Sequence, residues 1–260
     1  MNIDIAISTC PNDTFIFGAM LNGQIHVDHK FKPYLDDVQV LNRMALKNSA
    51  DIIKVSYGVI PDILDNYSIL KSGGALGFGC GPLVVAKEDR PVKELERVAI
   101  PGVNTSAFRF FKMFFGDKFH FIQMRFDMVM PAILSGEVDA GVVIHEGRFV
   151  YEKMGLVKLC DLGEIYENKF KSPVPLGAIV ISKSIISEAE LINFRIRKSI
   201  EFAEANYEKV LPYIQEHAME MDDEVICQHI ELYVNEFSKD VTPAIPALCS
   251  FLNTDDSVFV

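Results

Sequence analysis

Short apolar runs of strand length alternate with helix-length segments along most of the chain. In residues 3–8 apolar and polar side chains alternate, which is typical of a half-buried strand, and residues 15–21 form an apolar segment of helical length. The same order recurs at residues 97–100 and 107–115, where a loop again separates a strand-like run from a helix-like one. A chain that alternates in this way is predicted to form an α/β fold, with helices covering the sheets.

The same patterns predict further elements and two domains. Strands are expected at residues 51–55, 83–86, 119–123, 138–144, 157–162 and 178–182. Helices are expected at residues 38–47, 127–134, 149–154, 194–207 and 225–237. Residues 87–97 and 172–177 are interpreted as crossings between domains. We therefore expect an outer domain of residues 1–86 and 178–260 and an inserted domain of residues 87–177, with a ligand in the cleft between them.

The composition excludes several classes of protein. Hydrophobic residues make up 49% of the 260 residues, without a long polar tract, which indicates a globular chain with a substantial core. No apolar run approaches the roughly 20 residues needed to cross a bilayer, so membrane insertion is not expected. The net charge of -11 argues against generic nucleic-acid binding, because phosphate contacts need clustered lysine and arginine.

The N-terminus and the cysteines indicate the compartment. The first ten residues begin a strand at once and lack a basic segment followed by an apolar one, so no secretory signal is expected. The five cysteines are scattered and odd in number, without a CxxC pair. They suit reduced thiols, and we expect a cytoplasmic protein.

His145 is the first candidate for chemistry. It follows the apolar run of residues 138–144, which is too short and too rich in β-branched residues for a helix and is expected to be a buried strand. Polar residues at the carboxyl end of such a strand face the crevice where open α/β sheets bind ligands. A titratable imidazole there is a candidate for proton transfer, although capping or surface histidines are common at strand ends.

Two residues close to His145 each fit more than one role. Glu146 could orient His145 or carry charge for the site, and an acidic residue in a helix's first turn is also favourable through the helix dipole. Arg148 could pair with Glu146 or with a carboxylate of the substrate, and a structural ion pair is an equal alternative.

Two loops precede helices and are candidate anion sites. Asn12, Asp13 and Thr14 form the first, and Asn104, Thr105 and Ser106 form the second. The N-terminus of a helix presents free backbone N–H groups, which favours a carboxylate or phosphate of the substrate. Ordinary capping of the helices by the same side chains is the alternative.

Polar residues also follow the strand expected at residues 51–55. Ser56 and Tyr57 occupy this junction, where a serine hydroxyl could bind substrate or cap the next helix.

The most glycine-dense segment, residues 72–82, contains Gly79, Cys80 and Gly81. Its spacing fits neither GxGxxG after a strand nor GxxxxGK[ST], so a nucleotide loop is rejected. Close approach of the backbone to a ligand or a neighbouring strand is the preferred interpretation. Cys80 could act as a nucleophile, but no basic residue adjoins it in sequence, and inert thiols are more common.

The remaining histidines lie outside recognisable motifs. No two of the six histidines have the spacing of zinc ligands within a supporting cluster, so no metal site is expected. Five are interpreted as surface or core residues: His26, His29, His120, His217 and His229.

Four motifs carry a resemblance to a known family. They are STCPNDTFIF at residues 8–17, KVSYG at 54–58, GFGCGPLVV at 77–85 and GEVDAGVVIHEGR at 136–148. Together they resemble the 1,4-dihydroxy-6-naphthoate synthase family of the futalosine route of menaquinone biosynthesis, up to about residue 182. Thr9 departs from the proline usual in that family, which should affect the stiffness of the loop more than its chemistry.

The resemblance implies a fold and an activity. The fold would be the type 2 periplasmic-binding-protein architecture, with two α/β domains joined by two crossing strands. The activity would be that of a cofactor-free lyase that converts cyclic dehypoxanthine futalosine to 1,4-dihydroxy-6-naphthoate. His145 matches the family's catalytic base and would act as a neutral imidazole near its unperturbed pKa.

The remaining roles follow from the same resemblance. One of the two helix N-termini would bind the substrate carboxylate, and both stay candidates. Ser56 and Tyr57 would hydrogen-bond polar groups in the cleft, which the backbone of residues 79–81 would line. The expected partner is a small carboxylated molecule, and the sequence leaves the oligomeric state open.

Two alternatives share the expected fold. Chorismate dehydratase of the same route is expected to lack His145, and a solute-binding protein for a small carboxylate would need no base.

Overall fold

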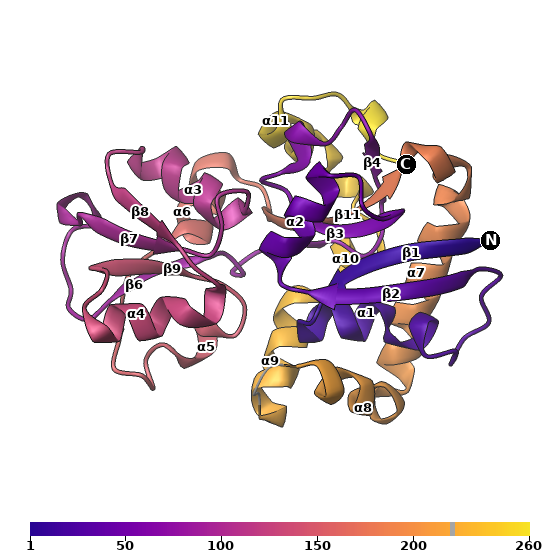
Figure 1. The fold of residues 1–260 in the computed structure, drawn as a ribbon, viewed down its shortest axis with the longest axis horizontal. Helices are drawn as coiled ribbons and strands as arrows, with labels where there is room; N and C mark the ends of the chain where they lie inside the picture. The colour runs from indigo at the N-terminus through magenta and orange to yellow at the C-terminus, as the bar shows by residue number, and fades with distance from the viewer. Residues whose placement is uncertain (219–221) are drawn as a thin grey trace.

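The computed structural model describes residues 1–218 and 222–260, which form two β-sheets, each covered by helices (Figure 1). The first sheet contains β1 (Asn2–Ser8), β2 (Lys30–Asp36), β3 (Ile52–Ser56), β4 (Tyr67–Ile69), β5 (Ala75–Gly77) and β11 (Val174–Ser182). The second contains β6 (Leu83–Ala86), β7 (Arg97–Ile100), β8 (His120–Gln123), β9 (Ala140–Val143) and β10 (Val157–Asp161). The predicted α/β architecture is confirmed.

The first sheet has the order β2-β1-β3-β11-β4, and β5 pairs with β11. Strand β1 is parallel to β2 and β3, whereas β11 is antiparallel to β3, β4 and β5. Every residue of β3 is buried, including Lys54. Because β3 and β11 lie in the middle of the sheet with helices on both faces, their apolar runs are nearly continuous.

Helix α1 (Pro11–Leu21) is at the centre of the helices on one face of this sheet. It packs against α7 (Ala189–Ala205), α8 (Tyr207–His217) and α9 (Asp223–Tyr233), and only Leu21 of its residues is not buried. After its polar first turn, α1 is apolar on all sides, and such a helix is stable only when it is surrounded in this way. Helix α2 (Val38–Leu46) packs on β3 and β1, and Figure 1 shows it on the opposite side of the sheet from α1.

The second sheet has the order β10-β6-β9-β7-β8. Strands β7, β8 and β9 are parallel, and β6 is antiparallel to β9 and β10. Its helices are α3 (Ser106–Phe115), α4 (Val129–Ser135), α5 (Gly147–Val150) and α6 (Leu162–Phe170). The last helices, α10 (Glu236–Lys239) and α11 (Ile245–Leu252), belong to the C-terminal segment. Single 3₁₀ turns occupy Ile60–Asp62, Val92–Glu94, Phe126–Met128, Thr242–Ala244 and Asp256–Val258, and a longer 3₁₀ segment with a kink at Ile185 occupies Lys183–Glu188.

The chain passes between the two sheets twice, and the first passage differs from the expected one. It lies between β5 and β6, at residues 78–82, because β6 pairs within the second sheet. Residues 87–97 connect β6 to β7 and do not cross between the sheets. The return lies between α6 and β11, at residues 171–173. We therefore propose residues 1–77 and 174–260 as the first domain and 83–170 as the second, in place of the boundaries at 86 and 178.

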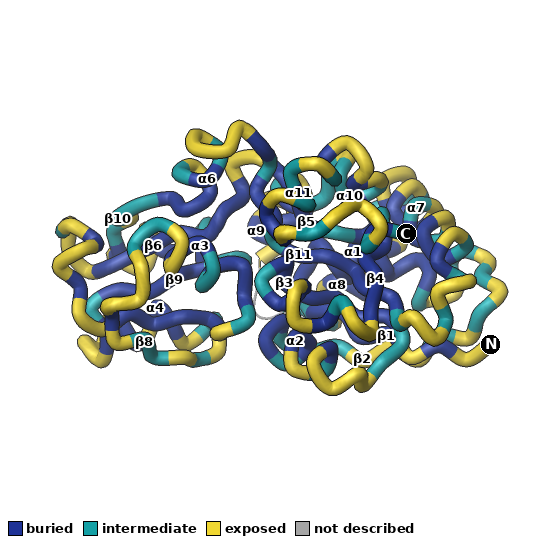
Figure 2. Tube along the Cα trace, turned by 90° about the horizontal axis from the view of Figure 1, so that it is seen from above, coloured by how far each residue is buried: buried dark blue, intermediate teal, exposed yellow. Residues whose placement is uncertain are grey.

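The two domains pack directly on each other. One continuous hydrophobic cluster contains residues of both, such as Tyr57, Phe110 and Phe251. Arg109 of α3 donates a 2.7 Å hydrogen bond to the carbonyl of Phe251 in α11, and its guanidinium lies 4.2 Å from the centroid of that ring. Figure 2 shows buried segments running through both domains, with exposed residues at the outer loops. Of the helices described, none is long and apolar enough to span a membrane.

Several elements differ from the sequence prediction. Strands β2, β4 and β5 and helix α6 were not predicted, and the expected crossing at 172–177 is largely the first half of β11. The helix expected at 149–154 is α5, which begins and ends earlier. The helix expected at 194–207 ends at Ala205, and α8 begins after Asn206, whose backbone is not helical. The segment expected as one helix at 225–237 is divided between α9 and α10.

Candidate active site

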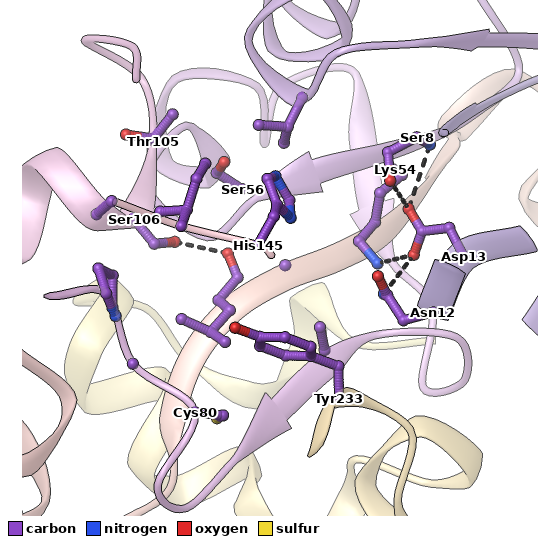
Figure 3. Close-up of a pocket in the computed structure, with 18 of the residues that line it drawn as sticks. Ser8, Asn12, Asp13, Lys54, Ser56, Cys80, Thr105, Ser106, His145 and Tyr233 are labelled. Atoms are coloured by element: carbon purple, nitrogen blue, oxygen red, sulfur yellow. Dashed lines mark hydrogen bonds and ion pairs between the residues drawn. The ribbon is translucent and has the colours of Figure 1, made fainter. Parts of the chain in front are cut away.

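A pocket with an empty volume of about 650 Å³ is lined by residues of both domains (Figure 3). The polar residues that line it from the first domain are Ser8, Asn12, Asp13, Lys54, Ser56, His229 and Tyr233. The second domain and the first crossing contribute Cys80, Gly81, Thr105, Ser106 and His145. A pocket therefore lies between the two domains, where the sequence predicts the ligand to bind.

His145 follows β9 with Ile144, and both residues line the pocket. Its backbone has a φ of 53°, in the left-handed region that residues other than glycine rarely adopt. The turn is held by hydrogen bonds from the amide of Gly147 to Ile144 and from the amide of Arg148 to His145. Such a conformation costs on the order of 1–2 kcal/mol, and strained residues of this kind cluster at functional sites.

The His145 ring is held between Cys10 and Phe126. The Cys10 sulfur lies 3.3 Å from Nδ1 and 3.8 Å from Nε2, and the Phe126 ring packs edge to face at 5.0 Å. Burial lowers the pKa of His145 to about 4, while the nearby Asp13 opposes this shift. The expectation of an unperturbed pKa is therefore wrong, because the protein desolvates the ring. At neutral pH the imidazole is uncharged and free to accept a proton.

The Cys10 thiol remains protonated. Its burial raises its pKa well above the ordinary value, and the carboxylates of Asp13 and Glu146 act in the same direction. A nucleophilic Cys–His pair needs a stabilised thiolate, so this pair does not have the electrostatics of one. The thiol can instead donate to, or accept from, the imidazole and hold its orientation.

Asp13 is the centre of a buried polar cluster at the start of α1. Its Oδ1 accepts from Lys54 Nζ at 2.5 Å and from Asn12 Nδ2 at 2.9 Å. Its Oδ2 accepts from the hydroxyl and the amide of Ser8, at 2.6 and 3.2 Å. Figure 3 shows these bonds along one wall of the pocket. The α1 terminus therefore already has a carboxylate of the protein in its first turn, which disfavours a second anion there.

The N-terminus of α3 is less occupied. Thr105 caps the helix by accepting from the amide of Phe108 at 3.2 Å. The Ser106 hydroxyl donates to the Leu176 carbonyl at 2.7 Å and accepts from the amide of Gly58. Within residues 1–218 and 222–260, the amides of Ser106 and Ala107 have no hydrogen-bond acceptor, and both residues line the pocket. Of the two expected anion sites, the geometry favours this one.

The glycine-rich crossing is fixed from the second domain. Arg148 donates to the carbonyl of Gly81 at 2.6 Å and to Asp161 Oδ2 at 2.7 Å. A β-carbon on Gly81 would overlap the backbone of Gly163, so only glycine fits there. Cys80 is buried, and its pKa is raised to about 12, so it lines the pocket as a thiol.

The structure separates the fourteen expected site residues into two groups. Those that line the pocket are Asn12, Asp13, Ser56, Cys80, Gly81, Thr105, Ser106 and His145. Those that do not are Thr14, Tyr57, Gly79, Asn104, Glu146 and Arg148.

Most residues of the second group have contacts within the protein. The Thr14 hydroxyl donates to the Cys10 carbonyl, the Asn104 side chain accepts from Gln39, and the Gly79 amide donates to Glu167. Tyr57 is buried, and burial raises its pKa.

Glu146 does not hydrogen-bond His145, so the suggested orienting role has no contact to support it. Burial raises the pKa of Glu146 to about 7, and its Oε2 has no partner among the described residues.

Five polar residues at the site were not predicted: Ser8, Cys10, Lys54, His229 and Tyr233. Ser8, Cys10 and Lys54 lie inside the motifs at residues 8–17 and 54–58. A lysine within the apolar run of β3 indicates a buried, paired charge, so Lys54 could have been found from the sequence. His229 and Tyr233 are one turn apart on the buried face of α9, and nothing local in the sequence shows what that face meets. Among residues 1–218 and 222–260, no group of three or more histidine, cysteine or acidic side chains is arranged to hold a metal ion.

Comparisons of the sequence find close relatives over nearly the whole chain. The family described as menaquinone biosynthesis matches residues 3–253. A protein of Thermus thermophilus named 1,4-dihydroxy-6-naphtoate synthase is 41% identical over 238 residues, 91% of this chain and 87% of the relative. A protein of Streptomyces coelicolor with the same name is 41% identical over 245 residues, 92% and 87% of the two chains.

Comparisons of the structure agree on the fold. A crystal structure of a protein from Archaeoglobus fulgidus is similar with a TM-score of 0.91 and 30% identity, covering 97% of this chain and 95% of that one. The alkanesulfonate-binding protein of Xanthomonas axonopodis, solved with bound MOPS, has a TM-score of 0.73 at 10% identity, covering 96% and 90%. The second likeness shows that the expected periplasmic-binding-protein-like architecture is present.

Proposed function

The chain belongs to the menaquinone-biosynthesis family, and we propose that its activity there is the conversion of cyclic dehypoxanthine futalosine to 1,4-dihydroxy-6-naphthoate. The observation that carries this proposal is a neutral, desolvated imidazole, His145, held by Cys10 in a pocket between two domains. A solute-binding protein of the same fold needs no such base.

The proposed reaction begins at His145. The unprotonated imidazole removes a proton from the sugar-derived part of the substrate and starts cleavage of a carbon–carbon bond. Aromatisation of the bicyclic part supplies the driving force. Burial of the pocket between the domains limits water around the ring, which strengthens electrostatic interactions with the reacting groups.

The substrate carboxylate is assigned to the N-terminus of α3. The free amides of Ser106 and Ala107 point to this assignment, together with the occupation of the α1 terminus by Asp13. The positive end of a helix dipole stabilises an anion there without a charged side chain. Ser56 lines the same pocket, and a hydrogen bond to a polar group of the substrate is proposed for its hydroxyl.

The cytoplasm is the proposed location. All five cysteines are free thiols in the structure, as expected for a reducing compartment.

The decisive experiment is incubation of the purified protein with cyclic dehypoxanthine futalosine, with naphthoate release followed by chromatography and absorbance. Wild-type turnover is expected, and His145→Ala should reduce kcat at least 100-fold, since general bases typically contribute that much. His26→Ala is the matched control, because the His26 side chain is 84% exposed. No turnover by the wild type would reject the lyase, and an unimpaired His145→Ala would reject the base.

The carboxylate assignment has its own test. The product, 1,4-dihydroxy-6-naphthoate, should inhibit more strongly than 1,4-dihydroxynaphthalene, which lacks the carboxylate. Ala107→Asp places a negative charge beside the free amides and should abolish that difference. If the difference survives in Ala107→Asp, the carboxylate binds elsewhere.

A further inference from the structure

His229 on α9 is a buried histidine without a hydrogen-bond partner. Its side chain has no exposed surface, and within residues 1–218 and 222–260 neither ring nitrogen has a partner. An imidazole always has at least one N–H donor, and when neutral it also has one acceptor. Leaving such groups unpaired in the interior is costly, so an unpaired buried group requires an explanation.

The location of His229 explains why its ring nitrogens have no partner within the protein. The residue lines the pocket, and its ring centroid lies 6.2 Å from that of His145, with 21° between the two ring planes. The rings of Tyr233 and Phe149 lie 4.6 and 6.4 Å from it and fill its apolar sides. The imidazole is therefore enclosed by aromatic rings, beside the group to which the proton transfer is assigned.

Tyr233, one turn further along α9, also lines the pocket. The residue is mostly buried, and its hydroxyl makes no hydrogen bond to a described residue. Figure 3 shows its hydroxyl reaching toward the middle of the pocket. Burial raises the pKa of Tyr233, so the hydroxyl keeps its proton and can donate it in a hydrogen bond.

We propose that His229 and Tyr233 bind the oxygen-bearing, sugar-derived ring of the substrate, beside the position at which His145 removes the proton. A neutral imidazole can donate to one oxygen and accept from a hydroxyl, which suits a ring that carries hydroxyl groups. The bound substrate completes hydrogen bonds that the empty protein lacks. This inference rests on the proposed function, because it takes the sugar-derived ring as the ligand.

The first test is kinetic. His229→Leu keeps an apolar side chain of similar size and should lower kcat/KM at least tenfold, whereas His229→Asn, which keeps one donor and one acceptor, should recover part of the loss. Tyr233→Phe should lower kcat/KM in the same direction. His29→Leu is the matched control, because His29 is also a mostly buried histidine, and it pairs with Glu188 away from the pocket. Unchanged kcat/KM in both His229 variants would overturn the proposal.

The second test separates binding from structure. If His229 serves the ligand and not the fold, His229→Leu without ligand should melt at the wild-type temperature or above it, because an unpaired polar group has been removed. A lower melting temperature together with an unchanged KM would identify a structural histidine and reject the proposal.

The third test does not depend on turnover. In ¹⁵N-histidine-labelled His145→Ala protein, the His229 ring nitrogens should shift on addition of cyclic dehypoxanthine futalosine, and the His29 ring should not. Absence of a His229 shift overturns the inference whatever the turnover assay shows. A shift without wild-type turnover would reject the proposed reaction and leave the binding role supported.

Discussion

The sulfur of Cys10 lies 3.3 Å from Nδ1 of His145, so the loop before α1 in the first domain contacts the imidazole carried by the second. The contact joins two residues that are 135 positions apart in the chain. Because each partner comes from a different domain, the orientation of the proposed base depends on how closely the domains approach each other.

Loss of this contact should impair catalysis without abolishing it. Cys10→Ala removes the hydrogen-bond partner of His145 and should lower kcat/KM roughly tenfold, in line with the typical free energy of one hydrogen bond. Cys10→Ser keeps a donor and acceptor and should lose less. Steady-state kinetics measure both, and Cys249→Ala, which changes a cysteine outside the pocket, serves as the control.

The protonation state of Cys10 has a separate consequence. With its pKa raised by burial, Cys10 should react with iodoacetamide at pH 7 far more slowly than the exposed Cys227. Rapid alkylation of Cys10, located by mass spectrometry of peptides, would indicate a thiolate beside an imidazolium and contradict the neutral pair.

The pH dependence of the reaction should reflect the lowered pKa of His145. A base with a pKa of about 4 is unprotonated above that pH, so kcat/KM should stay nearly constant from pH 8 to pH 5 and fall by half near pH 4. An unperturbed histidine would already have lost most of its activity at pH 5. A pH profile of kcat/KM with its acid limb centred near 6.5 would show that desolvation does not lower the pKa of His145.

Glu146 should make the stability of the protein depend on pH in the opposite sense to a paired carboxylate. Its pKa is raised from 4.5 to about 7, so the folded state favours the protonated form. That preference stabilises the fold below pH 4.5 and is lost as the pH rises through 7. Glu146→Gln, which stays neutral, should therefore gain about 2–3 kcal/mol relative to the wild type between pH 5 and pH 8. Urea unfolding at both pH values measures this, and a constant difference would refute it.

The buried pair of Lys54 and Asp13 should show strong coupling. Lys54→Met leaves the Asp13 carboxylate buried without its cation and should cost about 3–5 kcal/mol of unfolding free energy. Asp13→Asn alone leaves the ammonium unpaired and should also destabilise. The double variant should be more stable than either single change predicts by addition, because no unpaired charge remains. Additive effects in urea unfolding would mean that the pair is hydrated and weak.

The fold was predictable where burial imposes a pattern. Strands such as β3 and β7 have apolar runs because helices cover both faces of their sheets, and β1 has the alternating pattern of a strand. Strand β2 was missed because it is an edge strand with lysines and Pro33, residues that protect such edges and weaken the strand signal. The short β4 and β5 depend on pairing with β11, which no local pattern reveals.

A site residue was predictable only where one motif shows both a suitable side chain and its place at a strand end or a helix start. His145, Asp13 and Ser106 were expected from strand ends and helix starts, and they do line the pocket. The lowered pKa of His145 was not predictable, because desolvation of the ring depends on which residues pack around it. His229 was assigned to the surface or core histidines, since its role depends on which surface of the folded protein α9 covers.

The order of strands in the first sheet has a consequence during synthesis. The second domain is one uninterrupted stretch, so its sheet can close while the chain is still on the ribosome. Until β11 emerges, one edge of β3 has no neighbouring strand, and β4 and β5 have no strand to pair with. The second domain can therefore fold before the first has all its strands, and α9, which contains His229 and Tyr233, is translated later still. The last residues of the proposed binding pocket are therefore translated after every strand of both sheets.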